Sequence, residues 1–129
     1  MRCAAVLCVD DAEEILSFYR DLLGGYGYEV LVAANGSEAL ELFRTATPPI
    51  RAAIIDYHMP GMTGLELAAS LKRLDPNLPI VMVAGNAPQL DQMSPFVDAA
   101  IPKGVPIHQI TSHLELLIEE RTTRTQPIG

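Results

Sequence analysis

The sequence predicts an α/β fold in which a five-stranded parallel sheet is covered by helices on both faces. Three observations lead to this prediction. Short apolar runs rich in Val and Ile alternate along the chain with segments of helical period. The runs are continuously apolar, as expected of parallel strands that are buried on both faces. The length of 129 residues, 49% of them hydrophobic, fits a single domain of this class.

The predicted strands are separated by turn-forming and helix-forming residues. They span residues 4–9, 28–33, 52–56, 79–84 and 98–101. Because successive parallel strands in one sheet need a long crossover connection, a helix is expected after each strand.

The first two helices follow from their apolar spacing. The first ends at Gly24-Gly25, since glycine is favoured where a helix stops, and its apolar face carries Ile15, Leu16, Tyr19, Leu22 and Leu23. The second begins after Asn35, which has the capping-box spacing to Glu38, and buries Ala39, Leu40 and Phe43.

The third helix begins at Thr63, again with capping-box spacing to Glu66, and ends before Asp75-Pro76 because proline cannot continue a helix. The fourth is expected to be short, about two turns within residues 87–96, because Pro88 and Pro95 interrupt it.

The last helix runs from Ile107 to Arg121, with Ile110, Leu114, Leu117 and Ile118 at helical spacing. Residues 122–129 lack periodicity and contain Pro127, so they are predicted to be a tail or the beginning of a linker. Five strands and five helices in alternation predict a doubly wound, flavodoxin-like (βα)5 domain over residues 1–121, with strand order 2-1-3-4-5.

Charged residues follow three of the predicted strands. Asp10 and Asp11 follow the first, Asp56 ends the third, and Lys103 follows the fifth. In a doubly wound sheet the functional crevice lies at the carboxyl ends of the strands, so these side chains should converge. Three carboxylates at contact distance need a cation, and Mg²⁺ prefers oxygen ligands. The group therefore predicts phosphoryl transfer to a carboxylate, with Mg²⁺ and a lysine neutralising the phosphoryl charge.

Each of these residues also has a simpler structural interpretation. Asp10 and Asp11 can cap the first helix, Asp56 can begin a turn before Pro60-Gly61, and Lys103 can be a solvated loop lysine. The occurrence of all of them directly after strands favours the site.

The composition argues against several other classes of function. The net charge of −7 argues against direct binding of nucleic acid, whose phosphates need clustered Lys and Arg. No apolar run approaches the roughly 20 residues of a membrane span, and Asp10-Asp11 interrupts the N-terminal run too early for a signal peptide, so a cytoplasmic domain is expected. Cys3 and Cys8 lie too far apart in one strand to form a disulfide.

Three segments together resemble the response-regulator receiver domain of two-component signalling. They are Val9-Asp10-Asp11, Pro102-Lys103, and the segment from Asp56 through Met59-Pro60 and Met62 to Gly64. The resemblance extends over residues 4 to about 120, and the segment after Asp56 is its most specific part.

The resemblance implies that Asp56 is the phosphoacceptor, that Asp11 is the principal Mg²⁺ carboxylate with Asp10 as its helper, and that the His58 backbone carbonyl is a further metal ligand. It implies that Lys103 contacts the phosphoryl group. A histidine kinase or phosphotransfer protein would be the donor, and an output domain or protein the receiving partner. Such a chain is a signalling domain that assists its own phosphoryl transfer and hydrolysis, not an enzyme acting on an external substrate.

The sequence departs from the family pattern on the strand 4 to strand 5 side. Ala84 stands where the family usually has Thr or Ser, Ala100 where it has Tyr or Phe, and Gly104 where it has Pro. We therefore hypothesise that phosphorylation is retained while the rearrangement of the strand 4–helix 5 face is altered or reduced. Among the remaining polar and sulfur side chains, we expect no catalytic duty of His108 or His113, and we expect Met59 and Met62 to pack in the loop.

Two other functions stay open at this stage. A docking module that is never phosphorylated would explain Ala84 and Ala100 but not the acids and the lysine. A phosphohydrolase with an aspartyl nucleophile would need a second carboxylate two residues after Asp56, where His58 stands. The sequence does not distinguish a stand-alone receiver from one that belongs to a longer regulator.

Overall fold

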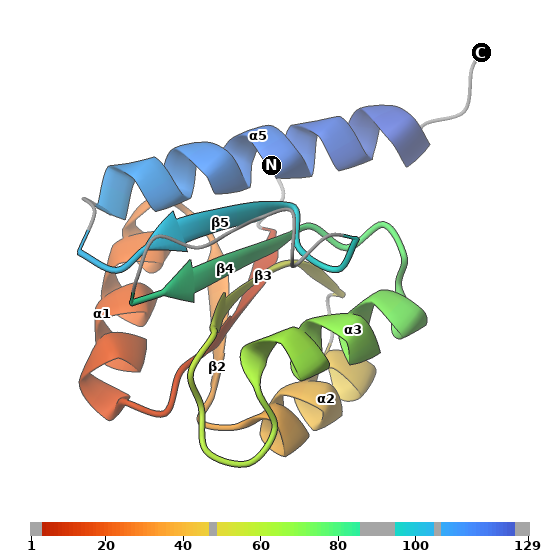
Figure 1. Cartoon of the computed structure of the whole chain (residues 1–129). Coiled ribbons are helices and arrows are strands. Elements are labelled where there is room, and N and C mark those ends of the chain that lie inside the picture. The colour runs from red at the N-terminus through yellow and green to blue at the C-terminus, as the bar shows by residue number, and fades with distance from the viewer. Residues whose placement is uncertain (1–3, 47–48, 86–94, 105–106, 126–129) are drawn as a thin grey trace.

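The computed structural model describes residues 4–46, 49–85, 95–104 and 107–125, and it confirms the predicted sheet (Figure 1). All strand pairs are parallel, and the order is β2-β1-β3-β4-β5. The strands are β1 (Ala5–Val9), β2 (Glu29–Ala33), β3 (Ile50–Asp56), β4 (Ile80–Ala84) and β5 (Ala99–Pro102). The doubly wound, flavodoxin-like architecture is therefore present.

The helices that the structure describes cover both faces of the sheet, as Figure 1 shows. They are α1 (Glu13–Gly25), α2 (Gly36–Thr45), α3 (Gly64–Leu74) and α5 (Ile107–Thr125). Alternate residues of β3 supply the two cores: Ala53 and Ile55 pack with α2 and α3, whereas Ala52 and Ile54 pack with α1 and α5. Burial on both faces explains why residues 52–55 of β3 are apolar without interruption.

The predicted starts of α2 and α3 are confirmed by their caps. The side chain of Asn35 accepts a hydrogen bond from the Glu38 N–H at 2.9 Å. Thr63 and Glu66 form a complete capping box, in which each side chain accepts from the other residue's backbone N–H.

The predicted end of α1 is confirmed, since the helix ends at Gly25, but neither glycine is its C-cap residue. The helix includes Gly24 and Gly25, neither of which has a positive φ, and Tyr26 is its C-cap residue. The positive φ of 94° that lets the chain turn back toward β2 belongs to Gly27. Ile15 also departs from its predicted place on the buried face, because 40% of it is exposed.

The last helix is longer than predicted, since α5 continues past Arg121 to Thr125. Residues 122–125, which were predicted to belong to a tail, are therefore helical, and residues 126–129 lie outside the described residues. The predicted fourth helix lies mostly in residues 86–94, outside the described residues. Among the described residues, no helix has the length and apolar character needed to cross a membrane.

Candidate functional site

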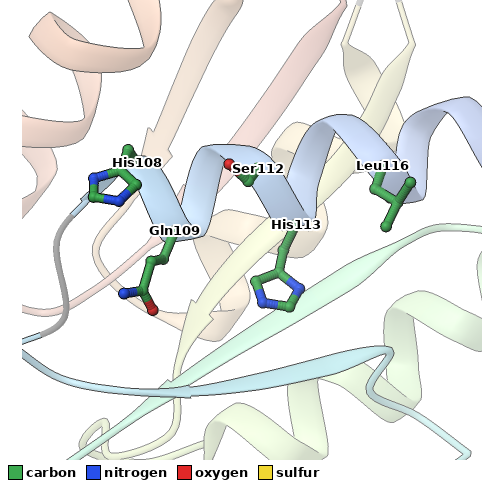
Figure 2. Close-up of a pocket in the computed structure, with 5 residues that line it drawn as sticks. All are labelled: His108, Gln109, Ser112, His113 and Leu116. Carbon is green, nitrogen blue, oxygen red and sulfur yellow. The ribbon is translucent and has the colours of Figure 1, made fainter.

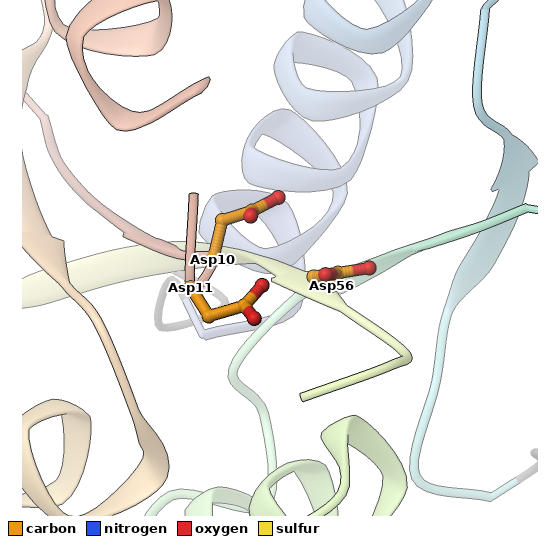
Figure 3. Close-up of side chains that lie close together, drawn as sticks. All are labelled: Asp10, Asp11 and Asp56. Atoms are coloured by element: carbon orange, nitrogen blue, oxygen red, sulfur yellow. The ribbon is translucent and has the colours of Figure 1, made fainter. Parts of the chain in front are cut away.

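Three carboxylates meet at the carboxyl end of the sheet, as the sequence predicts (Figure 3). Asp10 and Asp11 follow β1, and Asp56 is the last residue of β3. One oxygen from each carboxylate lies within 4.8 Å of one from each of the others. Asp10 is 5% exposed and Asp56 3%, whereas Asp11 faces solvent. β1 and β3 are neighbours in the sheet, and this pairing brings the acids together.

Asp10 is held by the backbone where the chain enters α1. Its Oδ1 accepts a hydrogen bond from the Ala12 N–H at 2.9 Å. Burial raises the pKa of the Asp10 carboxyl, the Ala12 N–H lowers it, and the negative charge of Asp56 raises it again. The N-cap residue of α1 is Ala12, which provides no side-chain cap. Neither Asp10 nor Asp11 is therefore the N-cap residue of α1, contrary to the simpler structural interpretation.

The predicted lysine also reaches the site. The Nζ of Lys103 lies 3.2 Å from Oδ1 of Asp56, and 47% of the lysine side chain is exposed. Its backbone N–H donates to the Ala84 carbonyl at 2.7 Å, which ties the chain after β5 to the end of β4. The ammonium thus balances one of the three negative charges.

Glycine allows α3 to begin directly beside β3. The Gly64 N–H donates to the Tyr57 carbonyl at 3.1 Å. A Cβ at Gly64 would collide with the carbonyl oxygen of Asp56 and would lie 2.8 Å from the Tyr57 Cα. In the same loop, Met59 is buried and Met62 is partly buried against the core, which confirms their predicted packing role.

His58 contributes its main chain to the site. Its N–H donates to Oδ1 of Asp56 at 3.4 Å. The exposed imidazole makes an edge-to-face contact with the Tyr57 ring, with the centroids 4.9 Å apart. The assignment of the His58 carbonyl as a metal ligand stays a prediction.

The other two histidines lie on α5, as expected. His108 and His113 line a cavity of about 230 Å³ on this helix, together with Gln109, Ser112 and Leu116 (Figure 2). None of these residues belongs to the acid cluster.

The three departures from the family pattern have clear structural settings. Ala84 is buried at the end of β4, where it offers no hydroxyl, and Ala100 is partly buried in β5. Gly104 has a φ of 94°, a value that the ring of proline cannot adopt. The turn after Lys103 therefore differs in backbone conformation from one that contains proline.

Sequence reasoning assigned Tyr19 only to the core of α1, and that assignment is incomplete. Tyr19 is buried, and burial raises the pKa of its hydroxyl, with smaller contributions from Cys8, Asp10 and Asp56. The phenol thus lies within electrostatic range of the acid cluster. Its helical spacing is that of any core residue, so the sequence contains no signal of this proximity.

The donor set fits a hard divalent cation. Three carboxylates and one ammonium leave two negative charges at one point, and the oxygens are close enough to share an ion. Mg²⁺ is bound in proteins by a small number of carboxylates together with substrate phosphate oxygens. Asp10, Asp11 and Asp56 are therefore suitable ligands for Mg²⁺.

Comparisons with known proteins agree with this arrangement. The family model described as the response regulator receiver domain matches residues 6–115. The DNA-binding transcriptional regulator NtrC of Escherichia coli (strain K12) is 28% identical over 130 residues, which cover 98% of this chain but 27% of that protein. This chain therefore spans about a quarter of the length of that relative.

Solved structures of similar proteins have the same fold. A CheY-like response regulator receiver domain protein from Methanospirillum hungatei is 28% identical with a TM-score of 0.85, over 95% of this chain and 99% of the other. The response regulator protein TrrA from Thermotoga maritima, in complex with Mg²⁺ and BeF, is 27% identical with a TM-score of 0.79, over 88% and 98% of the two chains.

Proposed function

Because this chain belongs to the response regulator receiver domain family, we propose that Asp56 accepts a phosphoryl group from a histidine kinase or a phosphotransfer protein. The observation that supports this proposal is the environment of one buried carboxylate. Asp56 lies beside two further acids and 3.2 Å from the Lys103 ammonium. A buried carboxylate with these neighbours is suited to receive a charged group together with a divalent cation.

The two oxygens of Asp56 have different roles in the proposed transfer. Oδ1 contacts the Lys103 ammonium and the His58 N–H, whereas Oδ2 accepts no hydrogen bond within the described residues. Oδ2 forms the new bond to phosphorus. The phosphorus–nitrogen bond of the donor's phosphohistidine breaks, and its electron pair stays on the imidazole nitrogen, which takes up a proton. Lys103 then contacts a phosphoryl oxygen.

Asp10, Asp11 and Asp56 would hold Mg²⁺, with the His58 backbone carbonyl as a further ligand. When bound, the ion supplies positive charge between the carboxylates and the phosphoryl oxygens. The complex of the similar protein TrrA with Mg²⁺ and BeF supports this choice of metal. Within the chain itself, the Ala12 N–H orients Asp10, and the pairing of β1 with β3 holds the two acidic segments together.

We further propose that a protein donor docks on α1. Ile15 and Phe18 are exposed apolar side chains in the first two turns of this helix, which begins two residues after Asp11. A donor histidine must come within bonding distance of Asp56, so the donor must contact elements at this end of the sheet. Phe18→Ala should slow transfer from the protein donor while leaving phosphorylation by acetyl phosphate unchanged.

The signal itself is proposed to be a change in the β4–α5 face that is smaller than usual in the family. The backbone bond from Lys103 to Ala84 couples the lysine to β4, but neither Ala84 nor Ala100 carries a polar or aromatic group that could respond to the phosphoryl group. A hydrogen bond from a hydroxyl to a charged group contributes about 1.5–3 kcal/mol, and Ala84 cannot form one with the phosphoryl group. Large amide shifts throughout residues 95–104 on adding beryllofluoride with Mg²⁺ would contradict this proposal.

The decisive experiment is phosphorylation by acetyl phosphate with Mg²⁺, followed by intact mass measurement. The wild type should gain the mass of one phosphoryl group, and neither Asp56→Asn nor EDTA-treated wild type should gain it. The same measurement separates the second candidate, a docking module that is never phosphorylated, which Ala84 and Ala100 favour. A wild type that gains no mass would support the docking module, and an adduct that persists in Asp56→Asn would place the acceptor elsewhere.

A further inference from the structure

A second cavity lies where β3 begins, at the opposite end of the strands from the acid cluster. It has a volume of about 520 Å³ and is formed where α2 ends, β3 begins and α3 ends. The lining residues that matter for its chemistry are Phe43, Arg44, Pro49, Arg51, Leu74 and Asp75. The proposed phosphorylation uses none of them.

Arg51 reaches this cavity because of an irregularity in the pairing where β1 and β3 begin. Ala5 of β1 pairs with Ile50 of β3, and the next residue, Val6, pairs with Ala52. Arg51 is therefore an extra residue of β3 at a bulge. The bulge keeps Ile50 in the same core as Ala53 while Arg51 is exposed, although the rest of β3 is buried. A bulge that redirects one side chain is a feature found next to functional sites.

Two guanidinium groups therefore line one cavity of an acidic protein. Neither Arg44 nor Arg51 forms an ion pair or a side-chain hydrogen bond within the described part of the chain. Nearby Lys72 is different, because its Nζ is bound to Asp98 at 2.9 Å and to the Leu78 carbonyl at 2.7 Å. The two arginines keep their donors available for a ligand.

The rest of the lining is mainly apolar. Phe43 packs partly against the core, and Leu74 is 47% exposed at the end of α3. Asp75 accepts a hydrogen bond from the Asn77 N–H at 3.1 Å and contributes one negative charge. A few polar groups on apolar walls, in a volume of about 300–1,000 Å³, are typical of small-molecule sites.

We propose that this cavity binds a small organic anion. Its carboxylate or phosphate group contacts Arg44 and Arg51, whose planar guanidiniums match oxyanions, and its apolar body lies against Phe43 and Leu74. A purely structural role accounts for Arg44, which lies in the last turn of α2 and complements the helix dipole there. It does not account for Arg51, which lies on a strand.

The test is an amide chemical-shift titration of the whole, unphosphorylated chain in EDTA, so that the metal-free acid cluster repels anionic probes. Three probes separate the contribution of the anionic group from that of the apolar ring. Phenyl phosphate carries both, inorganic phosphate carries only the anionic group, and phenol carries only the ring. Phenyl phosphate should give saturable shifts confined to residues that line the cavity. It should bind about tenfold more tightly than inorganic phosphate, because the ring buries apolar area.

Variants identify the residues that bind. The double variant Arg44→Gln with Arg51→Gln should lose the phenyl phosphate shifts, and urea unfolding checks that it is folded. Arg73→Gln is the matched control, since Arg73 is exposed in the last turn of α3 but does not line the cavity. The proposal is overturned by an absence of saturable shifts, by equal binding of phenyl phosphate and inorganic phosphate, or by an Arg73→Gln loss as large as that of the double variant.

Discussion

Removing the charge of Asp56 should stabilise the metal-free protein, although it abolishes the proposed function. Asp56 is 3% exposed and lies within 4.8 Å of two other carboxylates. Asparagine has nearly the same shape and can keep the hydrogen bond from the His58 N–H. The substitution Asp56→Asn therefore removes like-charge repulsion with little change in packing.

The size of the effect follows from the geometry. At 4.8 Å and an effective dielectric constant of roughly 20, two unit charges repel by about 3.5 kcal/mol, which applies to the buried pair Asp10 and Asp56. Asp11 repels Asp56, and Lys103 attracts it from the shorter distance of 3.2 Å. Both side chains are exposed, so solvent screens these contributions, and the net attraction that remains offsets part of the repulsion by Asp10. We expect Asp56→Asn to raise the free energy of unfolding by about 2 kcal/mol, or Tm by about 8 °C.

The assay is urea unfolding followed by circular dichroism, carried out in EDTA and again in excess Mg²⁺. The stabilisation should be present in EDTA and should shrink in Mg²⁺, because the ion stabilises only the folded wild type that binds it. Asp21→Asn is the control, since Asp21 is an exposed acid of α1 outside the cluster. Equal or lower stability of Asp56→Asn in EDTA would refute the reasoning that these acids repel one another.

Three further predictions concern residues around the site and the sheet, all measured by urea unfolding. Gly64→Ala should lower the free energy of unfolding by about 1–3 kcal/mol, because the new Cβ meets backbone that cannot move away. Asp98→Ala should cost about 1–3 kcal/mol, because the Lys72 ammonium loses its ion pair and the Ile80 N–H loses its acceptor. Tyr28→Phe should reduce the loss of stability in alkali. Burial, and then the charge of Glu115, raise the pKa of the Tyr28 hydroxyl above its ordinary value of about 10. The unfolded chain therefore loses this proton first, and the free energy of unfolding of the wild type falls as the pH rises above about 10.

Each of these predictions has a control within the chain. Gly85→Ala should be better tolerated than Gly64→Ala, since a Cβ at Gly85 meets nothing within 4 Å. Equal losses would mean that close approach is not the reason for Gly64. Asp21→Asn is again the control variant, here for Asp98→Ala. For Tyr28→Phe the control is Tyr26→Phe, since Tyr26 is exposed. If Tyr28→Phe loses as much stability in alkali as the wild type, burial of the Tyr28 hydroxyl is not the cause of that loss.

Much of the fold was predictable because its signals are local. A strand buried on both faces must be apolar at every position, and the cap residues Asn35 and Thr63 act within one turn of their own helices. The residue that turns the chain after α1 was not predictable in the same way. The sequence pattern indicated Gly24-Gly25, whereas the connection to β2 gives Gly27 the positive φ.

The candidate site was predictable to the level of residues but not of atoms. Asp10, Asp11, Asp56 and Lys103 could be identified because each directly follows or ends a parallel strand, and such ends meet at one edge of the sheet. The Ala84 carbonyl that holds the lysine backbone could not be found, because any residue has a carbonyl. The proximity of Tyr19 was likewise hidden, since its spacing is that of a core residue.

The sequence by itself determined the alternation of strands and helices, the edge of the sheet that carries charge, and the residue types gathered there. Hydrophobic periodicity, capping and strand-end position act over a few residues, and they can be seen without knowing where the rest of the chain lies. Only the tertiary structure decided which oxygen of Asp56 contacts Lys103, how Gly104 turns, and that a bulge exposes Arg51 beside Arg44. These features depend on strand register and on contacts between segments far apart in the chain, which no local pattern specifies.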